Sequence, residues 1–399
     1  HCNYDPVTTM RPQLHATAQT LLYRGIAGKP CFIEEMGTIG PITVSDDLTS
    51  SYLRASFLSA WAHDCRAAMW WCAYDQKHLT QAPYDWCLAE EELGFFRKDR
   101  SAKPVAQAVK TFSEMLENLP VEFKPLPPRI TEGICVLSDD QDQWAVAYGA
   151  FLLAKQAGVD IEFQMYDQPL RDAQVYLLPC INGAKPLSRR AWLGLMEKVS
   201  EGATLYFSLD QGIVHGLEEA TGVEVKTRER VSFECLCRLN NEQEIRIPTD
   251  FRYVLEAKRA KVLGADAQGN PIFTEAEYGR GKVFLLTVPL ESKWTLQPRA
   301  LLSESFAAAW KIYSTVFSSK ASARAVHVFG EDIGATEHVI SSTQRVAIII
   351  NHTTTRSSHR FEITKGWSLG TIYRGQVRNN SVDIEPCDAA LLILQIESS

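Results

Sequence analysis

Two adjacent glutamates, Glu34 and Glu35, end a short apolar run and stand just before a glycine. The residues at 31–33 are apolar, Pro30 can begin a strand, and Gly37 permits a sharp exit from it. Barrel enzymes place catalytic groups at the carboxyl ends of their parallel strands. We therefore predict a chemically active carboxylate here. The alternative is an exposed acidic turn, the commoner position of paired glutamates.

Aromatic residues that could line a binding site occur on either side of this strand. His1 and Tyr4 lie in a short aromatic segment, and the apolar run at 67–74 contains the adjacent Trp70 and Trp71. Side chains alternate between the two faces of a strand, so one of these indoles faces a pocket and the other a helix. The alternation does not say which is which.

The surrounding pattern is one of buried strands alternating with amphipathic helices. Apolar spacing predicts helices at 10–23 and 52–63, the second capped by Thr49 or Ser50, and a third helix that begins at Pro104. Such alternation is typical of a parallel sheet covered by helices. We therefore expect the last strands of a partial (β/α)8 TIM barrel over residues 1–119.

Three motifs in this segment resemble a known group. The Glu-x-Gly strand, the Trp-Trp-x-x-Tyr-Asp strand and the amino-terminal His and Tyr resemble the last three strands of clan A glycoside hydrolases. The nearest patterns are family 5 endoglucanases and mannanases, and family 42 β-galactosidases. The resemblance implies that Glu35 is the nucleophile, that His1 and Tyr4 lie near the sugar, and that Trp71 stacks under it. Trp70 is the second candidate for the stacking residue.

The implied reaction is hydrolysis of a β-linked glucan, mannan or galactoside with retention. A retaining enzyme uses two carboxyl groups about 5 Å apart, one as nucleophile and one as acid and then base. In these families the second carboxyl follows an Asn on an earlier strand, and nothing precedes His1 here. We therefore expect a fragment that lacks its acid/base residue and is inactive alone. Other acidic residues near Glu35 lack the expected context: Asp5, Glu34, Asp46, Asp47 and Asp75.

A Pro-rich linker at 120–128 precedes a second alternation of strands and helices over 129–320. This pattern predicts a doubly wound α/β domain. It resembles the amidotransferase-like, non-catalytic domain of family 42 enzymes, which implies a homo-oligomer formed through this domain. Cys180, His215 and Glu218 suggest a Cys-dependent amidotransferase-like enzyme as an alternative. The required Gly-flanked turn with a helix directly after it is absent around Cys180.

Short β-type runs separated by Gly and Asn turns predict a small antiparallel β-sandwich over 321–399. It resembles the carboxyl-terminal β domain of the same enzymes. A non-catalytic carbohydrate-binding or assembly protein with this fold is the alternative from another functional class.

Composition excludes several partners. The 399 residues carry a formal net charge of -7 without a basic block, which disfavours nucleic acid. No apolar run is long enough to span a membrane. Ten scattered cysteines favour a reducing, cytoplasmic compartment, although the chain does not begin with Met and we expect an earlier start. No metal or organic cofactor is implied, so a carbohydrate substrate is the one expected ligand.

Overall fold

The computed structural model describes residues 14–38, 42–86, 88, 91–239, 243–295, 309–328, 330 and 332–397. It divides into two compact units. The first contains the described residues up to Leu21, Lys29–Ile130 and Arg324–Ser399, and the second contains Leu22–Gly28 and Thr131–Ala323. No helix within the described ranges is both long and apolar enough to cross a membrane.

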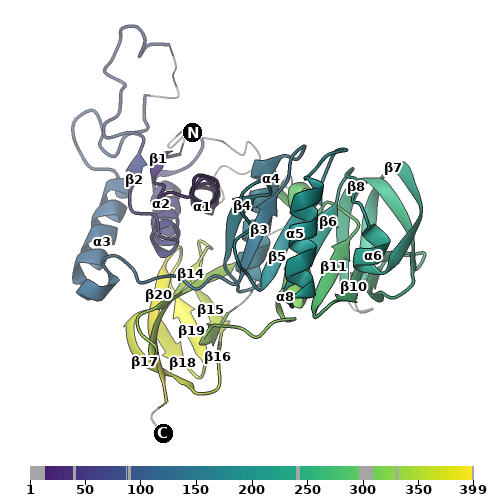
Figure 1. Cartoon of the computed structure of the whole chain (residues 1–399). Coiled ribbons are helices and arrows are strands. Elements are labelled where there is room, and N and C mark those ends of the chain that lie inside the picture. The colour runs from purple at the N-terminus through teal and green to yellow at the C-terminus, as the bar shows by residue number, and fades with distance from the viewer. Residues whose placement is uncertain are drawn as a thin grey trace. The chain divides into compact units, whose positions relative to one another are not determined.

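The amino-terminal segment of the first unit holds a pair of parallel strands with helices beside it (Figure 1). Ile33 pairs with Ala68 and Met36 with Trp70. Phe57 and Phe112 pack edge to face between α2 and α3, with ring centroids 5.4 Å apart. The elements in chain order are α1 (His15–Ala27), β1 (Ile33–Met36), α2 (Asp46–Ala62), β2 (Ala68–Trp70), α3 (Pro104–Asn118) and the 3₁₀ helix η2 (Val121–Phe123).

The start of α2 differs from the sequence prediction. The helix begins at Asp46, and the Oγ of Ser45 accepts a hydrogen bond from the backbone N–H of Leu48 at 3.3 Å. The prediction of a cap at Thr49 or Ser50 was wrong, because Asp46 and Asp47 form the first turn of the helix and do not belong to the preceding loop. Carboxylates in a first helical turn are favourable, since the unpaired N–H groups there carry positive partial charge.

The second unit is built on one nine-stranded sheet of order β4-β3-β5-β6-β11-β10-β9-β7-β8. The strands from β4 to β11 pair in parallel, and the remaining pairs are antiparallel. The predicted doubly wound pattern therefore accounts for only half of the sheet. The long β7–β8 hairpin was missed, and the hairpin predicted at Gly279–Gly281 is present. The strands are β3 (Gly133–Leu137), β4 (Ile161–Met165), β5 (Val175–Ile181), β6 (Thr204–Leu209), β7 (Val223–Leu239), β8 (Gln243–Ala257), β9 (Lys261–Ala265), β10 (Pro271–Tyr278) and β11 (Gly281–Leu286).

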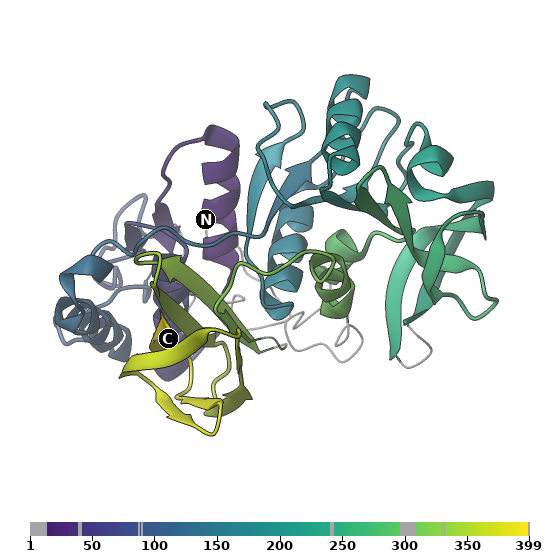
Figure 2. The same ribbon diagram turned by 60° about the horizontal axis from the view of Figure 1, so that its bottom comes forward.

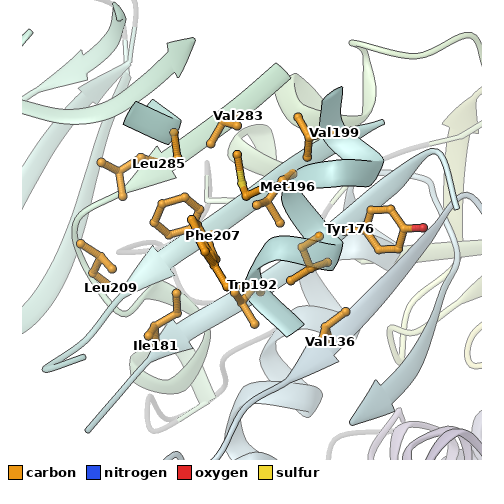
Figure 3. Packing of buried hydrophobic residues seen from close by; sticks show 14 of the residues in the cluster. Val136, Tyr176, Ile181, Trp192, Met196, Val199, Phe207, Leu209, Val283 and Leu285 are labelled. Atoms are coloured by element: carbon orange, nitrogen blue, oxygen red, sulfur yellow. The ribbon is translucent and has the colours of Figure 1, made fainter. Parts of the chain in front are cut away.

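Helices cover both faces of the parallel half (Figure 2). On one face, Trp192 of α5 packs edge to face on Phe207 of β6, within a core of apolar side chains (Figure 3). On the other face, Tyr206 of β6 packs on Tyr313 of α8. Neighbouring residues of β6 therefore pack against helices on opposite faces of the sheet. The helices are α4 (Gln143–Gln156), α5 (Arg189–Ser200), α6 (Leu217–Thr221), α7 (Leu290–Thr295) and α8 (Trp310–Phe317).

The carboxyl-terminal part of the first unit is the predicted antiparallel β structure. A four-stranded sheet, β13-β14-β20-β17, packs with a three-stranded sheet, β15-β19-β18, around a common core. Leu58 of α2 and Phe123 of η2 share a second core with Ile348 and Leu391 of this sheet. The segments predicted as the first and third domains therefore pack as one unit. The strands are β12 (Val326–His327), β13 (Ile333–Val339), β14 (Gln344–Asn351), β15 (Ser357–Arg360), β16 (Glu362–Ile363), β17 (Trp367–Arg374), β18 (Gln376–Arg378), β19 (Ser381–Ile384) and β20 (Ala389–Ile396).

Candidate active site

Glu35 lies near the carboxyl end of β1 and is exposed. The strand does not alternate strictly, because its pairing with β2 is irregular between Ile33 and Met36. Both of these apolar residues are buried in a core shared with Tyr52 of α2. The irregularity leaves Glu34 exposed as well as Glu35. Two consecutive carboxylates of β1 are therefore exposed.

Trp71 directly follows β2 and lies beside this strand end. Its backbone N–H donates to the carbonyl oxygen of Met36 at 2.9 Å, which extends the parallel pairing by one residue. Its side chain is 40% exposed. Trp70 has the opposite orientation: its ring stacks on Phe95 at 5.6 Å and packs against the buried Leu53 of α2. Of the two adjacent tryptophans, Trp71 is exposed and Trp70 is partly buried.

His1 and Tyr4, the other two predicted sugar-contacting residues, lie outside the described residues. Their predicted role remains untested. Among the acidic residues considered as partners of Glu35, Asp46 accepts a hydrogen bond from Arg97 at 3.0 Å in the first turn of α2. Glu34 is the exposed acidic neighbour of Glu35 in β1.

The loop that follows Trp71 is held by a buried ion pair that the sequence did not reveal. Lys103 Nζ lies 2.6 Å from Asp75 Oδ1, and both residues are more than nine-tenths buried. The same ammonium donates to the backbone carbonyl of Glu92 at 2.6 Å, and the N–H of Gly94 donates to Asp75 at 3.0 Å. Asp75 is therefore a structural anchor at the base of the loop, next to the candidate site.

Cys180, the centre of the amidotransferase alternative, lies in a closed polar cluster in the second unit. Its Sγ donates to Oε2 of the fully buried Glu291 at 3.2 Å. Glu291 also accepts hydrogen bonds from Tyr206 at 2.7 Å and from Ser208 at 2.7 Å. Burial, and then the carboxyl group of Glu291, raise the pKa of Cys180 well above its ordinary value. A thiol kept protonated is a poor nucleophile.

The other two residues of that alternative do not support it. His215 and Glu218 are exposed, whereas Cys180 is 1% exposed. Glu291 was not predicted from the sequence, where its one signal is an acidic residue directly after the mainly apolar run 283–290. Within the described ranges, no group of three or more His, Cys, Asp or Glu residues could hold a metal ion.

No protein-family model matches the sequence, and no curated protein is significantly similar to it. Solved structures are similar at the level of fold. A GH42 β-galactosidase from G. stearothermophilus has a TM-score of 0.66 at 12% identity, over 95% of this chain and 56% of that chain. The β-galactosidase from Rahnella sp. R3 has a TM-score of 0.67 at 13% identity, over 98% and 58%. An exo-β-1,4-mannosidase from Opitutaceae bacterium strain TAV5 has a TM-score of 0.58 at 17% identity, over 77% and 54%.

The chain shares its fold with clan A glycoside hydrolases. This confirms, for the fold, the resemblance predicted from the sequence motifs. Identities of 12–17% show the fold alone. The chain also spans little more than half of the length of these neighbours. Its activity and substrate therefore do not follow from the shared fold.

Proposed function

We propose that this chain is part of a retaining glycoside hydrolase that acts on a β-linked glucan, mannan or galactoside. One observation carries the proposal. Glu35 and Trp71 emerge from the same end of two adjacent parallel strands and are both exposed, while their neighbours Met36 and Trp70 pack toward α2. The carboxyl ends of parallel strands are where enzymes of this fold place their chemistry.

In the proposed mechanism, the Glu35 carboxylate attacks the anomeric carbon and the bond to the leaving oxygen breaks. A second carboxyl group protonates that oxygen and then deprotonates the water that releases the sugar. The Trp71 indole packs on the C–H face of the ring and excludes water from it. The nucleophile of a retaining enzyme attacks as the carboxylate, which is the form that the proposal requires of Glu35.

The test is covalent labelling of the protein expressed from its complete reading frame. A 2,4-dinitrophenyl 2-deoxy-2-fluoro-β-glycoside has a leaving group that needs no protonation, so labelling depends on the nucleophile. We expect the glycosyl group on Glu35 by peptide mass spectrometry. Glu35→Gln should abolish labelling, with a rate loss of about 10⁴-fold or more on ordinary substrates.

Glu34→Gln is the matched control, because Glu34 is the adjacent and equally exposed carboxylate on β1. It should keep the labelling. A label on Glu34, or turnover that survives Glu35→Gln, would contradict the assignment. Sugar binding that needs Trp71 but gives no label with any of the gluco-, manno- or galacto-configured reagents would favour the non-catalytic carbohydrate-binding alternative.

A further inference from the structure

The second unit contains a cavity that arises from an unusual connection. Parallel strands are normally joined by a crossover that contains a helix, as β5 and β6 are joined through α5. The connection from β4 to β5, residues 166–174, is a loop without a helix. Val136 of β3 lines a cavity together with residues of this loop and of α5. This cavity has a volume of about 570 Å³ and lies between the loop and the first two turns of α5.

Gly194 of α5 lines this cavity, although a residue with a side chain would make the helix more stable. A Cβ atom placed there would meet no atom within 4 Å, so no neighbour requires a glycine. A glycine within a helix is less favourable than alanine by about 0.5–1 kcal/mol. The helix thus presents bare backbone to the cavity at a position where any helix-forming residue would fit. This is the arrangement expected where a ligand approaches the helix closely.

The cavity is lined by one positively and one negatively charged side chain, which can form hydrogen bonds with a ligand. Arg190 and Asp167 line it, both are exposed, and neither side chain has a hydrogen bond or ion pair with another described residue. Tyr166 also lines the cavity, and its hydroxyl donates to Asp139 at 2.6 Å. Gln168 anchors the loop, since its amide accepts from the N–H of Met165 at 2.9 Å. The side chains at the cavity thus include a cationic donor, an anionic acceptor and an aromatic residue.

We propose that this cavity binds a neutral mono- or disaccharide. Sugar hydroxyls both donate and accept, so they can accept from the Arg190 guanidinium and donate to the Asp167 carboxylate. The Tyr166 ring suits the C–H face of a pyranose. A simple anion would gain one of these charges and be repelled by the other. The cavity volume lies within the usual range for small-molecule sites, about 300–1,000 Å³. This site uses no residue of the candidate active site, and its existence does not depend on Glu35.

The test is isothermal titration calorimetry on the full chain carrying Trp71→Ala, which removes sugar stacking at the candidate active site. The titrants are D-galactose, D-glucose, D-mannose and lactose, with inorganic phosphate as the anion. We expect at least one sugar to bind with a Kd of about 10 mM or tighter and phosphate not to bind. Failure of all four sugars, or binding of phosphate in their place, overturns the proposal.

Gly194→Leu locates the binding. The leucine side chain fills the cavity and improves the helix, so we expect sugar affinity to fall about tenfold or more while the melting temperature stays equal or rises. Leu193→Ala, at the exposed neighbour on α5, should leave the affinity unchanged. Arg190→Met should weaken binding without filling the cavity, which keeps the test valid if the leucine variant misfolds. Binding that survives both Gly194→Leu and Arg190→Met overturns the proposal.

Discussion

Cys180 has a backbone φ of +50° within β5, where the pairing with β6 is irregular between Leu178 and Ile181. The irregularity places the thiol on the side of Glu291 and returns Ile181 to the opposite core. The residue type suggested a nucleophile, but the surroundings keep it protonated and covered. Reactivity at the residue scale is therefore a property of the environment as much as of the side chain.

We predict that iodoacetamide does not alkylate Cys180 in the native protein at pH 8. Burial raises the pKa of this thiol, so its thiolate fraction is small at that pH. Cys31, which is partly exposed, should react and serves as the internal control. Peptide mass spectrometry before and after unfolding in urea measures both. Native labelling of Cys180 at the rate of Cys31 would revive the amidotransferase alternative.

The loop from Asp75 to Lys103 contains a buried ion pair between its first and last residues. Removing one partner of a buried ion pair leaves an uncompensated charge, which destabilises by about 3–5 kcal/mol. We therefore predict that Lys103→Met lowers the free energy of unfolding of the first unit by about that amount, measured by urea denaturation. Asp75→Asn added to Lys103→Met should restore part of the loss, because no buried charge then remains.

A surface pair in the same loop is the matched control. Lys77 lies 3.3 Å from Glu92, with side-chain exposures of 59% and 32%. Exposed pairs contribute at most about 1 kcal/mol, so Lys77→Met should change stability little. If Lys77→Met costs as much as Lys103→Met, the loop is not anchored by its buried pair.

On the scale of the whole molecule, the two compact units have separate hydrophobic cores. Leu178 is fully buried in the core of the nine-stranded sheet, and Leu392 is fully buried in the core of the β-sandwich. Units with their own cores can unfold separately. We predict two thermal transitions by calorimetry. Leu178→Ala should lower the free energy of unfolding of the second unit, and Leu392→Ala that of the first, each by about 2–5 kcal/mol. Each substitution should therefore lower the midpoint temperature of one transition only. A single transition shifted by both substitutions would contradict this.

Local patterns in the sequence determined much of the secondary structure. Pro104 begins α3, and the Ser188 side chain accepts from the N–H of Ala191 at the start of α5, as a cap should. The buried apolar runs at 134–137 and 161–165 are β3 and β4. These features depend on residues a few positions apart, so the sequence alone contains them. The likeness in fold to clan A glycoside hydrolases was also indicated by short motifs.

Pairing between distant segments decided the rest. The sequence placed Glu35 at a strand end, but only the irregular pairing with β2 left both Glu34 and Glu35 on the exposed face. Strand alternation alone did not distinguish Trp70 from Trp71, although the resemblance favoured Trp71; in the structure the Trp70 ring stacks on Phe95 and Trp71 is exposed. Strand periodicity gives two faces without saying which face meets a helix and which meets solvent, because that depends on neighbours remote in the chain.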